Sequence, residues 1–283
     1  MNGPSAILDG LAPIADRYDA FFIDQFGVVH DGTQPYPGAP EAIAALAARG
    51  KATVFITNSG RPAAFNEARL ARFGIPREDY LACVTSGDVA IALLEIGRIP
   101  LPRRRPLACL TLSSAGDFNL SDRLGFSRTD RGETADVVVI AGSQADRIAM
   151  SDYEALMRPA AARGAPCICT NPDRQMLTPS GLVPAAGALA DLYASFGGKV
   201  TFVGKPYRDI YEMAQAYVPE IPKSRILCIG DSIDHDIAGA AGFGAAKALV
   251  HTGILDGIAG TEISARLSKT RLSVDHHLAA LRW

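Results

Sequence analysis

Short apolar runs alternate along this chain with stretches of amphipathic, helical periodicity, and this alternation most limits the possible folds. Residues 21–24, 52–57 and 226–229 have the length and apolar character of buried strands, whereas residues 40–49 and 61–73 have helical periodicity and stop at a glycine. Strands that alternate with helices usually pair in parallel, with helices on both faces of the sheet. We therefore predict an α/β fold with a doubly wound parallel sheet.

Prolines interrupt this alternation just after Ile99, which is typical of a junction between domains. A second series of strands and helices starts at Leu107, and residues 200–203 are predicted to return to the first sheet. The sequence thus predicts a core domain with an inserted, smaller α/β cap domain. The expected limits are residues 1–98 and 185–283 for the core and 99–184 for the cap.

The composition favours a globular protein without nucleic-acid or membrane partners. With 283 residues and 48% hydrophobic content, the chain is long enough for two domains with ample cores. No apolar run approaches the ~20 residues that span a bilayer, and residues 1–4 lack the pattern of an export signal, so we expect a cytoplasmic protein. The formal charge of -2 and the single short basic run at 103–105 give no broad basic face for nucleic acid.

Four polar residues each follow an apolar run: Asp24, Thr57, Lys205 and Asp231. The carboxyl ends of parallel strands meet at one edge of a sheet, so these side chains are expected to surround a single ligand. A carboxylate nucleophile, a lysine and further carboxylates that hold Mg²⁺ are suited to phosphoryl transfer through a covalent aspartyl phosphate. The sequence therefore predicts a magnesium-dependent phosphoryl-transfer site at this edge.

The segments that carry these residues resemble the motifs of one enzyme superfamily. Taken singly, each segment is also typical of a turn or a helix cap, but their order and spacing along the chain are far more specific. The pattern resembles the haloacid dehalogenase superfamily, and in particular its subfamily IIA of sugar-phosphate, nitrophenylphosphate and pyridoxal-phosphate phosphatases, whose cap lies between the second and third motifs. The matching segments are residues 24–28, 57–59, 204–206 and 230–236, with 171–173 and 250–253 as further likenesses.

This resemblance implies a nucleophile and a set of metal ligands. Asp24 is expected to attack the phosphorus and to bind Mg²⁺, with the backbone carbonyl of Phe26 as a second ligand. Asp231 is expected to bind the metal directly. Asp236 would hold it through water or orient the lysine, and Asp234 is the neighbouring alternative for that role.

The resemblance also implies residues that bind the substrate, a small phosphorylated metabolite. Thr57 and Asn58 are expected to bind the phosphoryl group, and Lys205 is expected to supply positive charge. The resemblance is also compatible with a homodimer that forms through the cap domain. The further substrate-binding residues are expected to be Ser59, Arg61, Asn171 and Asp173.

Phe26 departs from the family pattern, in which a second aspartate at this position protonates the leaving group. Three interpretations stay open: the substrate needs little protonation, His30 or His235 replaces the acid, or the site binds phosphorylated ligands with little catalysis. An aromatic residue here also resembles metal-independent 2-haloacid dehalogenases, but the aspartates at 231, 234 and 236 favour a cation instead. The leading expectation is a phosphatase that is slowed by Phe26.

Overall fold

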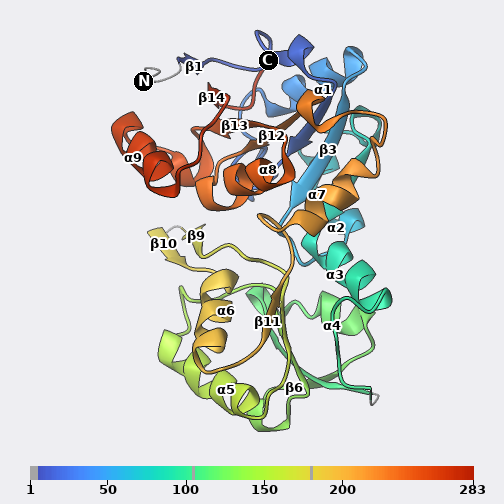
Figure 1. Ribbon diagram of the computed structural model, residues 1–283, viewed down its shortest axis with the longest axis vertical. Helices are drawn as coiled ribbons and strands as arrows, with labels where there is room; N and C mark the ends of the chain where they lie inside the picture. Colours follow the sequence, from blue (N-terminus) through green and yellow to red (C-terminus); the bar gives the residue numbers. More distant parts are fainter. Residues whose placement is uncertain (1–5, 104–105, 179–180) are drawn as a thin grey trace. The chain divides into compact units, whose positions relative to one another are not determined.

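The computed structural model describes residues 6–103, 106–178 and 181–283 (Figure 1). The expectations for residues 1–4 and for the arginines at 104 and 105 therefore lie outside the described residues. The chain forms two compact units. The first contains the described residues up to Thr57 together with Ala63–Val84 and Lys205–Trp283, and the second contains Asn58–Pro62 and Thr85–Gly204.

The first unit is built on a seven-stranded sheet with the order β1-β14-β13-β12-β2-β3-β4 (Figure 1). Its strands pair in parallel, which confirms the predicted α/β fold with a doubly wound parallel sheet. The strands are β1 (Ile7–Leu8), β2 (Ala20–Ile23), β3 (Ala52–Thr57), β4 (Ala82–Thr85), β12 (Ile226–Gly230), β13 (Ala246–Val250) and β14 (His276–Leu278).

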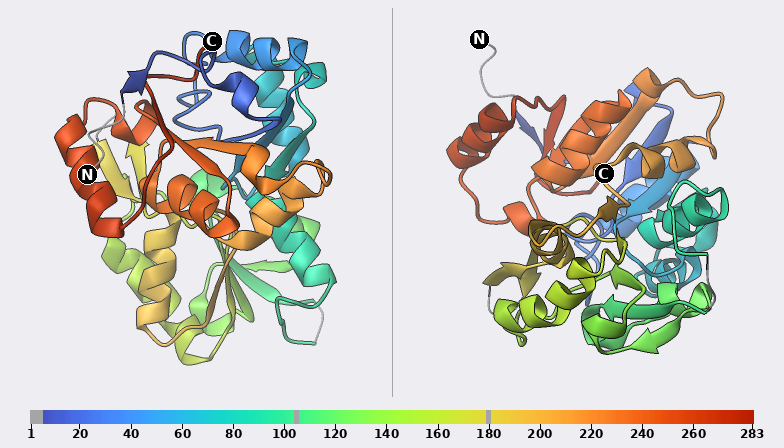
Figure 2. Two further views of the ribbon diagram at one scale, coloured as in Figure 1. Left: turned by 45° about the horizontal axis from the view of Figure 1, so that its top comes forward. Right: turned by 60° about the horizontal axis from the view of Figure 1, so that its bottom comes forward.

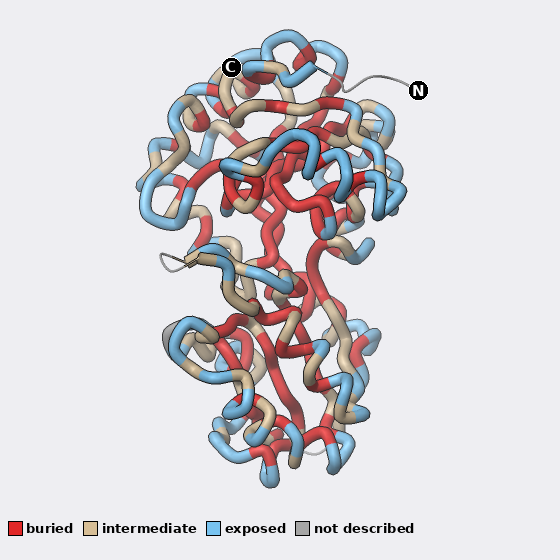
Figure 3. The backbone as a smooth tube through the Cα atoms, turned by 90° about the vertical axis from the view of Figure 1, so that its left-hand side faces the viewer, coloured by how far each residue is buried: buried red, intermediate tan, exposed pale blue. Residues whose placement is uncertain are grey.

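Helices cover both faces of this sheet. Successive side chains of a strand point to opposite faces, so neighbouring residues of β2 pack against different helices. Phe21 of β2 belongs to the same buried core as Ile43 of α1. Phe22, the next residue, lies 6.1 Å from Phe243 of α8 between ring centroids, and Phe243 stacks on Tyr211 of α7. Strands β2, β4 and β12 are accordingly buried along their whole length, whereas Ile7 of the edge strand β1 is exposed (Figure 3). The helices of this unit are α1 (Ala39–Ala48), α2 (Ala63–Arg72), α7 (Arg208–Gln215), α8 (Ala238–Phe243) and α9 (Gly260–Thr270).

The second unit has its own parallel sheet, with the order β11-β8-β7-β5-β6 (Figure 2). Met157 of α5 and Leu189 of α6 share a core with Ile140 of β7, so these two helices cover one face. The strands are β5 (Ala108–Leu112), β6 (Ser127–Thr129), β7 (Val137–Ile140), β8 (Cys167–Cys169) and β11 (Val200–Phe202), with a separate antiparallel hairpin of β9 (Gln175–Thr178) and β10 (Gly181–Pro184). The helices are α3 (Ser86–Glu95), α4 (Asn119–Arg123), α5 (Met150–Ala162) and α6 (Ala186–Ser195).

The prediction that residues 200–203 return to the first sheet is wrong. Strand β11 pairs in parallel with β8, with Val200 opposite Cys167, and therefore belongs to the second sheet. The chain returns to the first unit only at Lys205. The units change at 57/58, 62/63, 84/85 and 204/205, whereas the sequence predicts domain limits at 98/99 and 184/185.

The strand order of the first sheet creates a switch point between β2 and β12. From β2 the chain builds outward through β3 and β4, whereas β12, β13 and β14 extend in the other direction. Ligand sites of such sheets form at the carboxyl ends of the strands beside this switch point. In the described ranges, no helix combines the length and apolar character needed to cross a membrane.

Candidate active site

Asp24 follows β2 directly, at the switch point of the first sheet. Its backbone N–H donates to the carbonyl of Ile229 in β12 at 2.9 Å, which fixes the residue at the end of the strand. Its side chain is mostly buried, and Oδ1 lies 2.6 Å from Nζ of Lys205. An adjacent ammonium favours the ionised carboxylate, which is the form that can attack phosphorus.

The turn after Asp24 is closed by main-chain hydrogen bonds. The carbonyl of Gln25 accepts N–H groups from Val28, Val29 and His30, and the carbonyl of His30 accepts the N–H of Gly27. Gly27 has a φ of 86°, in the left-handed region that favours glycine. The tight turn therefore holds the residues after Asp24 in one conformation.

Asp231 follows β12, the strand next to β2, and is enclosed by main chain. Its Oδ2 accepts the N–H of Ile254 at 2.9 Å. A Cβ atom at Gly27 would lie 2.0 Å from this oxygen and one at Gly253 1.9 Å, so both glycines are needed for the close approach. Burial, together with the carboxylates of Asp24 and Asp236, raises the pKa of Asp231 well above its usual range.

Asp236 lies on the π-helical turn Ile233–Ile237, which leads into α8. Its Oδ2 accepts the N–H of Ser232 at 3.1 Å, and its Oδ1 lies 2.7 Å from Nζ of Lys205. Gly230 leaves room for the carboxylate, since a Cβ atom there would be 2.0 Å from Cγ of Asp236. Asp234, the alternative weighed from the sequence, is exposed, so Asp236 is the residue that joins the cluster.

Lys205 joins two of these carboxylates through a buried ammonium group. Its side chain is only 3% exposed, and Nζ bridges Asp24 and Asp236. The sequence predicts that this lysine follows a strand of the first sheet, but the strand before it is β11 of the second sheet. Lys205 reaches the cluster from the connection that leads into α7, rather than from the end of a neighbouring strand.

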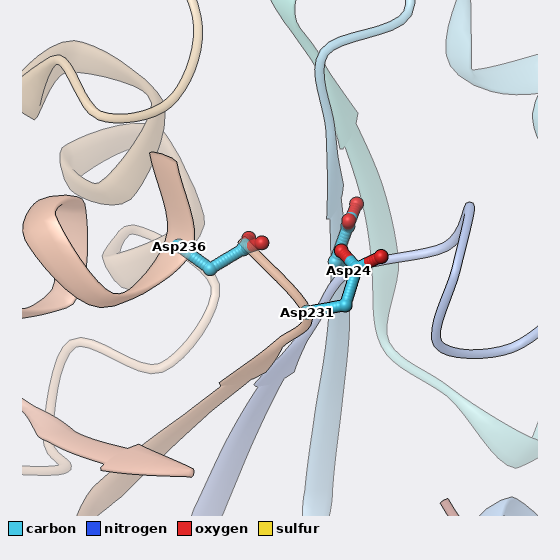
Figure 4. Close-up of side chains that lie close together, drawn as sticks. All are labelled: Asp24, Asp231 and Asp236. Atoms are coloured by element: carbon cyan, nitrogen blue, oxygen red, sulfur yellow. The ribbon is translucent and has the colours of Figure 1, made fainter. Parts of the chain in front are cut away.

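The three aspartates offer a set of ligand atoms suited to a divalent cation. Oxygens of Asp24, Asp231 and Asp236 lie within 4.8 Å of one another, and the carboxylates turn toward a common space (Figure 4). When ionised, they carry three negative charges against the one positive charge of Lys205. A cation that prefers oxygen ligands, such as Mg²⁺, would neutralise the remainder and lower the raised pKa of Asp231.

Two predicted phosphoryl-binding residues lie on either side of a boundary between the units. Thr57 is the last residue of β3 in the first unit, whereas Asn58 belongs to the second. The amide Nδ2 of Asn58 donates to Oδ1 of Asp173 at 2.9 Å, and Oδ1 of Asn171 accepts the N–H of Asp173. Within the second unit, the structure thus groups Asn58 with Asn171 and Asp173.

Ser59 and Arg61 make local and ionic contacts in the second unit. The hydroxyl of Ser59 accepts the N–H of Arg61 at 3.2 Å, and its carbonyl accepts the N–H of Gly87. The guanidinium of Arg61 forms an ion pair with Asp117. This contact engages Arg61 within its own unit.

The histidines and Phe26 have distinct surroundings. His30 is fully buried; its Nδ1 accepts the N–H of Gly32 at 3.0 Å, and its ring centroid lies 5.1 Å from that of Phe73. Burial and the nearby charge of Arg69 lower the pKa of His30 to about 4. The Phe26 ring meets His30 edge to face and is 43% exposed. The imidazole of His235 is within hydrogen-bond distance of the Ser232 hydroxyl.

Residues 252–254 support the site, although the sequence argument assigned them no role. The hydroxyl of Thr252 donates to the carbonyl of Gly27 at 2.6 Å, and Gly253 and Ile254 contact Asp231 as described above. The position of this segment directly after β13, at the same edge of the sheet, was the signal available in the sequence.

Two family models match parts of this chain. A family model described as haloacid dehalogenase-like hydrolase matches residues 21–111, and a second model of the same group, HAD-hydrolase-like, matches residues 202–269. These ranges contain all three carboxylates of the cluster, Lys205 and Thr57.

Relatives and solved structures extend the similarity over most of the chain. The 5'-nucleotidase YutF of Bacillus subtilis is 30% identical over 84% of this chain and 88% of its own length. The crystal structure of a haloacid dehalogenase-like hydrolase from Brucella suis has a TM-score of 0.81 and 33% identity, and covers 97% of this chain and 100% of the other. The glycerol phosphate phosphatase of Mycobacterium tuberculosis, solved with magnesium, has a TM-score of 0.62 and 28% identity over 85% of this chain and 70% of its own. The chain therefore belongs to the haloacid dehalogenase-like hydrolase family, as a phosphatase related to its subfamily IIA.

Proposed function

We propose that this protein is a Mg²⁺-dependent phosphatase that hydrolyses a small phosphorylated metabolite through an aspartyl phosphate on Asp24. The observation that carries this proposal is the buried contact of Asp24 with Lys205 inside the carboxylate cluster. A carboxylate at the end of a strand, with an ammonium group 2.6 Å away, is well placed to act as a nucleophile. The surrounding charges are also suited to an anionic phosphoryl group only when a cation is present.

The reaction would take place in two steps at this carboxylate. An oxygen of Asp24 forms a bond to phosphorus while the bond from phosphorus to the ester oxygen breaks, and the departing alkoxide takes up a proton. Water then attacks the phosphorus, which releases inorganic phosphate and restores Asp24. Lys205 would offset the negative charge that accumulates on the transferred oxygens.

The residues present suit the proposed metal. Asp24, Asp231 and Asp236 would hold Mg²⁺, together with the main-chain carbonyl of Phe26, and the ion would draw charge from the phosphoryl oxygens. Asp236 also contacts Lys205, so it would act on the metal and on the lysine at once. The magnesium complex of the related glycerol phosphate phosphatase supports this choice of ion.

The substrate is proposed to be a small phosphorylated sugar, polyol or nucleotide. The named activities of the relatives, a 5'-nucleotidase and a glycerol phosphate phosphatase, support this class. Thr57 and Asn58 are proposed to bind the phosphoryl group. The remaining proposed substrate contacts come from the second unit, as the cap, through Ser59, Arg61, Asn171 and Asp173.

Phe26 is proposed to make this phosphatase slow toward substrates with strongly basic leaving groups. Phenylalanine has no proton to give, and in this structure its ring is substantially exposed rather than engaged with the carboxylates. His30 would not replace the acid near neutral pH, because it is buried and its pKa is about 4. His235, which contacts Ser232, stays the alternative donor.

Chelation of Mg²⁺ should abolish phosphate release, and Asp24→Asn should lower kcat on the order of 10³-fold or more because the amide is not a nucleophile. Phosphate release from a panel of sugar phosphates and nucleotides measures both effects. Asp234→Asn is the matched control, since this aspartate is exposed and close in sequence to the cluster, and it should keep the activity of the original protein. Turnover that persists in EDTA would contradict the proposal, and halide release from a 2-haloacid would identify the dehalogenase alternative.

Phe26→Asp should raise kcat for alkyl phosphates by about 10²- to 10⁴-fold, the usual contribution of general acid-base catalysis. The gain should be much smaller for 4-nitrophenyl phosphate, whose leaving group departs with little protonation. Steady-state rates for the two substrate types measure the difference, and Phe26→Asn controls for the loss of the ring. Equal gains for both types would show that proton transfer is not what Phe26 removes.

Stability should fall as the pH is lowered from about 6.5 to about 4 because His30 is buried in its neutral form. Its folded-state pKa lies below the ordinary value of 6.5, so the unfolded chain binds the proton more readily in this window. Up to about 3 kcal/mol of unfolding free energy depends on this group. Denaturant unfolding at several pH values should show that the unfolding free energy of His30→Leu depends less on pH than that of the original protein. The same change of unfolding free energy with pH in both proteins would refute this assignment.

A further inference from the structure

Gln25 separates Asp24 from Phe26, and its side chain is buried at a free-energy cost. The residue is 1% exposed, and Oε1 has no hydrogen-bond partner among the residues that the structure describes. The other end of the amide, Nε2, donates to Sγ of Cys83 at 3.1 Å. Since a buried polar atom without a partner destabilises a fold, an apolar side chain of similar size would be expected here from stability alone.

The contact with Cys83 extends from the nucleophile turn across the sheet. Gln25 follows Asp24 at the end of β2, whereas Cys83 lies in β4, and β3 stands between these two strands. The hydrogen bond of the Gln25 side chain therefore connects the turn after β2 to β4, a strand that does not pair with β2. Cys83 is itself buried, at 5% exposure, in the same core as Phe21 and Ile23 of β2. The packing of this core holds the acceptor sulfur in place.

The main chain of Gln25 transmits this restraint to the nucleophile. Its carbonyl accepts the three N–H groups that close the turn, and its peptide nitrogen is bonded to Asp24. Rotation of the backbone at Gln25 would displace the Asp24 carboxylate from Lys205. A side chain that prevents this rotation acts on the reaction through Asp24.

We propose that Gln25 is a positioning residue, whose buried amide, held by Cys83, fixes the direction in which Asp24 presents its carboxylate to phosphorus. This inference rests on the proposed phosphatase function. The amide contributes orientation rather than substrate binding or proton transfer, because it is buried beneath the turn and does not ionise.

The test is Gln25→Met, which keeps the length of the side chain and removes its polar atoms. Because misplacement of a reacting group is costly, kcat should fall by about 10- to 100-fold. KM should stay within about twofold, since the substrate contacts are intact. The thermal unfolding temperature should stay the same or rise, because the unpartnered oxygen is gone. A role in stability alone would give the opposite pattern, with a lower unfolding temperature and an unchanged kcat.

Variants of Cys83 test the same contact from its other end. Cys83→Ala removes the acceptor and should reproduce the loss in kcat, whereas Cys83→Ser keeps a hydrogen-bonding atom and should restore most of it. Gln25→Met combined with Cys83→Ala should lose no more than either single variant if the two residues act as a unit. If Gln25→Met fails to fold, Cys83→Ala decides: a reduced kcat supports the inference and an unchanged kcat overturns it.

Thr53→Val is the matched control, because its buried hydroxyl also lacks a partner among the described residues but lies in β3, away from the nucleophile turn. Its kcat should equal that of the original protein. An unchanged kcat in Gln25→Met, with the original protein active and Asp24→Asn inert, overturns the positioning role and leaves the phosphatase function in place. If the original protein and Asp24→Asn are equally inactive, the proposed function fails and this inference fails with it.

Discussion

The ammonium of Lys205, buried between Asp24 and Asp236, is the interaction on which the rest of the site depends. When several carboxylates lie close together inside a protein, each makes it harder for the others to ionise, and the role proposed for Asp24 requires its ionised form. Nζ of Lys205 lies within 2.7 Å of an oxygen of each of these two aspartates and offsets part of their negative charge. Burial, followed by the charges of Asp24 and Asp236, raises the pKa of Asp231, the third carboxylate. With all three aspartates ionised, the cluster would carry more negative charge than Lys205 neutralises, and a divalent cation would complete the balance.

Much of this arrangement could be predicted from the sequence because it depends on local patterns. The apolar run at 52–57 predicted β3 with its observed bounds, and the polar residues after β2 and β12 identified two carboxylates that meet. The carboxyl ends of neighbouring parallel strands lie at one edge of the sheet, so the position of a residue just after such a strand is largely determined. The order of the motifs then indicated the family, and the comparisons confirm it.

Contacts set by long-range packing could not be predicted in the same way. Nothing in residues 200–203 distinguishes a strand of the first sheet from β11 of the second, because partner choice depends on residues far along the chain. Asp234 and Asp236 are the same type of residue, two positions apart, and the π-helical turn determines which of them is buried. The contacts of Gly253 with Asp231 and of Gln25 with Cys83 likewise appear only when separate strands are packed together.

Two of the four places where the chain passes from one unit to the other lie beside residues proposed for catalysis. One crossing falls between Thr57 and Asn58, and another between Gly204 and Lys205. At each of these two peptide links the backbone leaves one unit and enters the other. Gly204, with a φ of 115°, is well suited to such a link because other residues rarely adopt that conformation. Gly204 therefore supplies the backbone conformation directly before Lys205, the residue whose ammonium group contacts both Asp24 and Asp236.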